Sequence, residues 1–361
     1  MALARREFLV SAASFFGWAF AGLAIPTGDA LRAAAGFLTA RQSRDGAWRS
    51  ESHAVFRGGE TLTPVVLWAL QSADTAATAR GLHWLEALTD SQARRTAVAY
   101  PLFTAGYSAQ VFAASGDARR AALWADVIES LRIRAELGWP ADAAACGAWG
   151  DSATPPRLPR EVSPVPDMLA PNISATVLAL QALRAVGRRA ESALPFIGSC
   201  QNFSAGDPGD FNDGGFFFTP GDPVRNKAGI AGRDSTVRYR SYGSATCDGI
   251  LALRACGVPD GHPRLRAALD WLRVNSHGIA NGGVWPRERL AARDSLFFYH
   301  AQGLAAVALQ SQSRTLADAL RVVQASDGSW MGLAPDSCED EPLLATAFAM
   351  RALARTAEEN Q

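Results

Sequence analysis

Two kinds of segment alternate along the chain according to where their apolar residues fall. Glu60–Ser72 and Tyr100–Ala114 are apolar nearly all round, and each is followed by a segment with one apolar stripe, namely Thr75–Leu88 and Asp117–Arg134. A helix that is apolar on every side is usually buried, whereas a helix with one stripe covers a core with that stripe. The pattern therefore predicts buried helices alternating with covering helices.

The same alternation continues to the C-terminus. The other expected apolar helices are Pro171–Val186, Ser241–Cys256, Leu296–Gln310 and Pro342–Ala354, and the other striped ones are Asp29–Arg41, Arg189–Cys200, Pro263–Val274 and Thr315–Gln324. A repeated helical pair at a period of roughly fifty residues is typical of stacked repeat proteins. About six inner and six outer helices would close into an all-α fold, an (α/α)6 barrel or toroid.

A short motif recurs in the turns between these helices. Gln42 to Trp48 reads QSRDGAW, and Gln324 to Trp330 near the other end reads QASDGSW. A recurring motif of this kind marks a repeat architecture. Shorter copies occur at Gly147–Trp149, Asp213–Phe216 and Gly282–Trp285.

Composition limits the function. The 361 residues are 48% hydrophobic, and 35 Lys and Arg balance 35 Asp and Glu. A general nucleic-acid binder would need a basic excess, so we expect no nucleic-acid partner. The five cysteines form no CxxC pair, and we interpret them as small buried apolar residues rather than disulfide or metal ligands.

The N-terminus resembles a twin-arginine export signal. Arg5 and Arg6 precede the uncharged run Phe8–Thr27, and small residues near Ala21 offer a cleavage site. We therefore expect residues 1–26 to be a signal or anchor and 27–361 a single toroid domain, exported to the periplasm or the exterior. The alternatives are an uncleaved segment that associates with the membrane, because the run is about long enough to span it, or an ordinary helix.

Gln42–Trp48, with the helix before it, is similar to the QW motif of squalene–hopene and oxidosqualene cyclases. Those enzymes share an α/α toroid with the β subunits of protein prenyltransferases, and the resemblance spans roughly residues 29–355. It implies a central cavity that binds, or binds and transforms, an isoprenoid or another apolar small molecule. In the family the Gln and Trp side chains tie neighbouring helices together. We expect the Gln amide to bond free N–H groups of the next helix.

The catalytic motifs of the known enzymes with this fold are only partly present in the sequence. Class II cyclases carry Asp-x-Asp-Asp at one inner-helix start, whereas the matching segment here, Pro171–Thr176, has no carboxylate. Arg293–His300 resembles the prenyltransferase segment whose His binds zinc, and His300 is the matching residue. The accompanying Asp-x-Cys is missing, and Cys247 and Asp248 stand in the opposite order. Because zinc needs three or four good ligands, we expect no metal or other cofactor.

Candidate site residues follow from the same comparison. His300 would be a general acid or base, with Asp294 orienting it and Tyr299 beside it as a further catalytic candidate. Arg238 and Arg240 would bind a diphosphate, and the alternative is that they lie in a solvated loop. Tyr242 and Phe298 would stabilise a carbocation with their rings, and the alternative is that they pack in the core. The ligand-binding candidates are Arg238, Arg240, Tyr242, Cys247, Asp248 and Phe298.

Three functional interpretations stay open, and with them the question of whether the protein is an enzyme. The first is an isoprenoid-binding or isoprenoid-transforming toroid, and the second is a non-catalytic binding or scaffold toroid. The third is a carbohydrate-active α/α barrel, which would need a wet cleft with paired acids about 5–10 Å apart.

Overall fold

The computed structural model describes residues 26–71, 75–159, 165–204, 212–232, 238–276, 279–307 and 310–358. The signal or anchor expected for residues 1–26 lies outside these ranges except for Pro26, so that expectation stays a prediction. Within the ranges, no helix is both long and apolar enough to cross a membrane.

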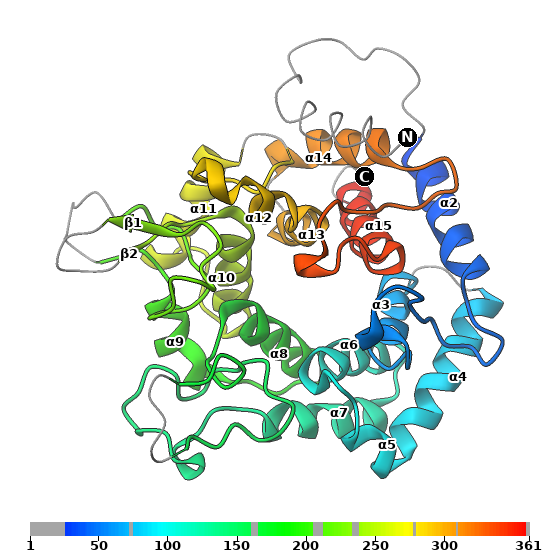
Figure 1. Cartoon of the computed structure of the whole chain (residues 1–361), viewed down its shortest axis with the longest axis horizontal. Helices are drawn as coiled ribbons and strands as arrows, with labels where there is room; N and C mark the ends of the chain where they lie inside the picture. The colour runs from blue at the N-terminus through cyan, green and yellow to red at the C-terminus, as the bar shows by residue number, and fades with distance from the viewer. Residues whose placement is uncertain are drawn as a thin grey trace.

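Helices form two concentric rings (Figure 1). Neighbours along the inner ring are in contact, and its last helix contacts its first, which closes the ring. The all-α toroid predicted from the alternating pattern is therefore confirmed. The inner helices are α3 (Leu62–Ala69), α6 (Pro101–Ala114), α8 (Ile173–Ala185), α10 (Gly243–Ala255), α13 (Phe297–Val307) and α15 (Pro342–Glu358).

The outer ring covers the inner one with the striped helices. These are α2 (Thr27–Ala40), α4 (Ala76–Asp90), α7 (Ala118–Ser130), α9 (Leu194–Ser199), α11 (Pro263–Asn275) and α14 (Gln310–Val323). The connecting segments carry α5 (Gln92–Thr96), α12 (Leu290–Asp294) and short 3-10 turns at Ala54–Phe56, Ala135–Leu137, Glu191–Ala193, Arg287–Arg289 and Pro335–Ser337. They also carry an antiparallel pair that the sequence pattern did not predict, β1 (Ile230–Gly232) with β2 (Arg238–Tyr239).

The turn motif links successive outer helices. The Gln42 amide donates hydrogen bonds to the carbonyls of Gly46 and Ala77, both at 2.8 Å, and Ala77 lies in the first turn of α4. The fully buried Trp48 donates its indole N–H to the carbonyl of Leu38 at 2.7 Å. The expected link between helices is present, but the glutamine amide donates to carbonyls there instead of accepting from free N–H groups.

The second copy of the motif closes the ring. The Gln324 amide bonds the carbonyls of Gly328 at 2.9 Å and Ala30 at 3.0 Å, and Ala30 belongs to the first outer helix. Trp330 repeats the tryptophan contact, donating to the carbonyl of Leu320 at 2.8 Å. The same motif that links α2 to α4 therefore also links the last outer helix, α14, to the first, α2.

Candidate functional site in the central cavity

A cavity of about 280 Å³ lies inside the inner ring. This is just below the usual range of ligand pockets, about 300–1,000 Å³. Most of its wall is apolar, and aromatic rings pack edge to face along it, with Tyr107 against Trp68 at 5.1 Å and against Phe103 at 4.8 Å between centroids. The lining residues come from α3, α6, α8, α10 and α13, together with the loops before α6 and α8 and the segment between α9 and β1.

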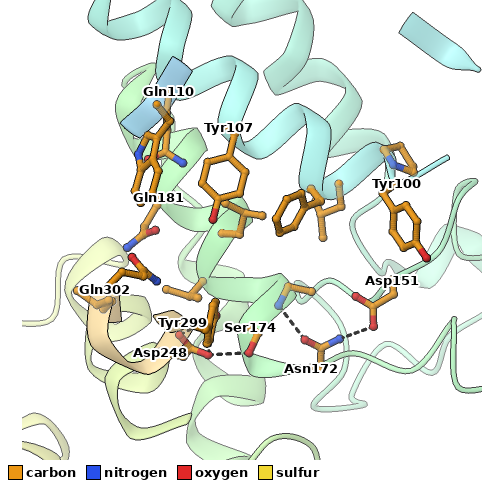
Figure 2. Close-up of a pocket in the computed structure, with 18 of the residues that line it drawn as sticks. Tyr100, Tyr107, Gln110, Asp151, Asn172, Ser174, Gln181, Asp248, Tyr299 and Gln302 are labelled. Carbon is orange, nitrogen blue, oxygen red and sulfur yellow. Dashed lines mark hydrogen bonds between the residues drawn. The ribbon is translucent and has the colours of Figure 1, made fainter. Parts of the chain in front are cut away.

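A buried carboxyl group projects into this cavity (Figure 2). Asp248, in the second turn of α10, is only 2% exposed. Ser174 on α8 donates its hydroxyl to one carboxyl oxygen at 2.6 Å, and the Tyr299 hydroxyl on α13 lies 3.0 Å from both oxygens. The carboxyl thus joins three inner helices.

Burial sets the protonation state of Asp248. It raises the pKa of the carboxyl to about 7, although the hydrogen bonds from Ser174 and Tyr299 favour the charged form and lower it. Burial also raises the pKa of the Tyr299 phenol, which therefore stays protonated and able to donate. Near neutral pH, Asp248 can hold a proton and can also release it.

The local sequence explains how the start of α8 is held next to the cavity. Asn172 caps α8 by accepting the N–H of Ala175 at 2.7 Å, and its amide bonds Asp151 at 2.9 Å. Asp151 lines the cavity with a side chain that is 45% exposed, and it pairs with Arg225 at 3.1 Å. Burial raises the pKa of Asp151, while Arg225 and the hydrogen bond from Asn172 lower it. A second carboxyl, more exposed than Asp248, therefore lines the cavity.

The expected pairing of Asp294 with His300 is wrong. His300 is fully buried and neither ring nitrogen has a hydrogen-bond partner, while burial lowers the pKa of its imidazole to about 4. Asp294 ends α12 and instead accepts from the Arg293 side chain at 2.7 Å. His300 is therefore neutral, and no carboxylate orients it.

Other candidates also lie away from the central cavity. Asp294 and Phe298 line a second pocket of about 500 Å³ that shares no lining residue with it. Cys247 is buried against Gly303, where α10 packs on α13. Within the described ranges, no three His, Cys, Asp or Glu side chains gather as metal ligands would.

The basic and aromatic candidates before α10 do not line the central cavity. Arg238 is half-buried on β2, and the Nε of Arg240 is buried without a hydrogen-bond partner. Tyr242 precedes α10 and packs edge to face on Trp285, with centroids 5.3 Å apart. Of the nine candidates, the structure brings together Asp248 and Tyr299.

Sequence reasoning named Asp248 as a ligand-binding candidate but looked for the proton-donating acid at the start of α8. The acid reaches Ser174, in that first turn, from the neighbouring helix α10. One signal was available, because Asp248 is the sole charged residue between Ser241 and Leu253. The cavity residues Asp151, Gln110, Gln181 and Gln302 were also missed.

Comparison with known proteins identifies the fold. The type II terpene cyclase MstE from Scytonema aligns with a TM-score of 0.57 and 13% identity over 92% of this chain and 98% of that one. A variant of it in complex with geranylgeranyl dihydroxybenzoate, its substrate, gives 0.57 and 14% over 92% and 97%. The GH76A alpha-1,6-mannanase from Salegentibacter gives 0.55 and 10% over 92% and 99%. No family model and no curated protein matches the sequence.

Proposed function

We propose that the protein binds an isoprenoid-like ligand in the central cavity and that Asp248 protonates it to start a cyclisation. One observation carries this proposal: a buried carboxyl with a pKa of about 7 faces an aromatic, mostly apolar cavity. A fold neighbour that binds a geranylgeranyl substrate supports the ligand class. The start of α8, where the class II cyclases would carry their acid, has no carboxylate. The acid would instead be supplied by the neighbouring helix α10.

The reaction would be an isomerisation that needs no co-reactant. The Asp248 proton adds to one carbon of a C=C bond, whose electron pair forms the new C–H bond and leaves a carbocation on the other carbon. A second double bond attacks this cation and forms a C–C bond. Loss of a proton from a neighbouring carbon then gives a cyclic alkene and restores the proton balance.

The residues around Asp248 suit both stages of this step. Ser174 and Tyr299 already donate hydrogen bonds to its carboxyl, so they would stabilise the carboxylate left after proton transfer. Trp68 and Tyr107 line the cavity, and their aromatic rings would stabilise the developing cation. The apolar wall would exclude water, which could otherwise trap the cation as an alcohol.

Incubation of the full chain with squalene, farnesol and geranylgeraniol in D₂O tests the proposal. We expect cyclic isomers that carry one deuterium, seen by mass spectrometry. The Asp248→Asn variant should lose at least about 100-fold in rate. Asp90→Asn, on the outer helix α4, is the matched control and should retain full activity. If no substrate is bound or converted, the proposal fails.

A second candidate function is glycoside hydrolysis. Asp151 and Asp248 line the same cavity, as an acid and a second carboxylate would, and a GH76 mannanase is among the fold neighbours. Release of reducing sugar from an α-1,6-mannan, lost in both Asp151→Asn and Asp248→Asn, would favour this candidate. Binding of isoprenoids without turnover of either substrate class would instead favour a non-catalytic toroid.

A further inference from the structure

Three glutamine side chains gather at one end of the central cavity. Figure 2 shows Gln110, Gln181 and Gln302 together, away from Tyr100 and Asp151 at the other end. They come from α6, α8 and α13 respectively, and all three line the cavity. Three separate inner helices therefore deliver the same functional group to one place.

These amides have unused hydrogen-bonding capacity. Gln110 commits one N–H to the carbonyl of Gly106 at 3.0 Å. Gln181 and Gln302 have no side-chain hydrogen bond to any other described residue. Each amide offers two N–H donors and one carbonyl acceptor, and polar groups inside proteins normally find partners. The cluster can thus receive a ligand group that both donates and accepts.

Charge narrows the class of that group. Among the described residues that line the cavity there is no Lys, Arg or His, whereas two are aspartates. The Arg351 guanidinium stacks on the ring of Trp68, 4.8 Å from its centroid, but Arg351 is not a lining residue. A diphosphate or carboxylate head would therefore find no cation to pair with among the described lining residues. Arg225 is already paired with Asp151, which lies at the opposite end of the cavity from the glutamines (Figure 2).

We infer that the ligand is an isoprenoid with a neutral hydroxyl head, an alcohol or a phenol, held by the amides of Gln110, Gln181 and Gln302. This inference rests on the proposed use of the cavity for an isoprenoid. On α13, Tyr299, which bonds Asp248, precedes Gln302 by only three residues, so the acid and the amides lie at the same end of the cavity (Figure 2).

Calorimetric titration of the full chain with three ligands of matched chain length tests the head group. We expect farnesol to bind at least about 10-fold more tightly than farnesyl diphosphate or the hydrocarbon farnesene. Gln181→Met and Gln302→Met keep the side-chain length but remove the amide. Each should weaken farnesol binding by about 3- to 10-fold, and farnesene binding should not fall. Gln92→Met, exposed on α5, is the matched control and should change nothing.

The outcomes separate this inference from the function on which it rests. If farnesyl diphosphate binds most tightly, or if both methionine variants bind farnesol as the unmodified chain does, the hydroxyl assignment is overturned while isoprenoid binding stands. If none of the three ligands binds, both proposals fail. Each variant is tested separately after its folding is checked by circular dichroism, and the comparison of ligands on the unmodified chain needs no variant.

Discussion

Replacing Asp248 with Asn should stabilise the protein more as the pH rises. The folded pKa of Asp248 is about 7, against 3.8 for an ordinary Asp, because burial disfavours its charged form. Between these values the unfolded chain releases a proton that the folded chain keeps, so the free energy of unfolding falls with rising pH. At about 1.4 kcal/mol per pH unit the loss approaches about 4 kcal/mol above pH 7. Asn cannot ionise, so the Asp248→Asn variant does not lose this stability as the pH rises.

Urea unfolding of both proteins from about pH 5 to about pH 8 measures this effect. The difference in unfolding free energy, variant minus unmodified, should grow by about 3 kcal/mol over that range. Asp90→Asn is a control, because hydrogen bonds from Arg120 and Arg119 lower the pKa of Asp90 to about 2. The stability that Asp90 contributes is lost only as the pH falls toward about 2. The difference in unfolding free energy between Asp90→Asn and the unmodified protein should therefore not change from about pH 5 to about pH 8. A flat difference for Asp248→Asn as well would refute the reasoning.

Three further substitutions test the site and the ring. Ser174→Ala removes a hydrogen bond that favours the carboxylate, so the pKa of Asp248 should rise further, as a carbon-detected NMR titration would report. Gly249→Ala would place a Cβ 2.4 Å from the Phe216 ring and should destabilise the fold by about 1–3 kcal/mol in denaturant unfolding. Gln324→Leu removes two hydrogen bonds, one of them to the first outer helix, and should cost about 1–3 kcal/mol; an unchanged melting temperature would contradict this.

The toroid was predictable because its signals are local. Apolar periodicity identified the inner helices, and the prediction of Tyr100–Ala114 differs from the observed Pro101–Ala114 by one residue. The prediction of Arg189–Cys200 as a single helix was less accurate, because Pro195 fits only the first turn of a helix. There the chain forms a 3-10 turn and then α9, which begins at Leu194.

The candidate site was not predictable in the same way, because it is assembled across the ring. Asp248 meets a serine 74 residues earlier and a tyrosine 51 residues later, and no spacing rule relates them. The comparison of sequence segments put His300 first and Tyr299 beside it as a further candidate, and of the two only Tyr299 lines the cavity. Adjacent helix positions point about 100° apart, so a correct segment can still give the wrong side chain.

Ring closure has a consequence for how the protein is made. The inner ring is complete only when α15 packs between α13 and α3, and His53 then meets Asp340 at 2.9 Å. Until the ribosome has released the last inner helix, the apolar sides of α3 and α13 lack their cover, and such surfaces promote aggregation. We therefore expect nascent chains to require chaperones until α15 has left the ribosome, and chains truncated before α15 to be degraded.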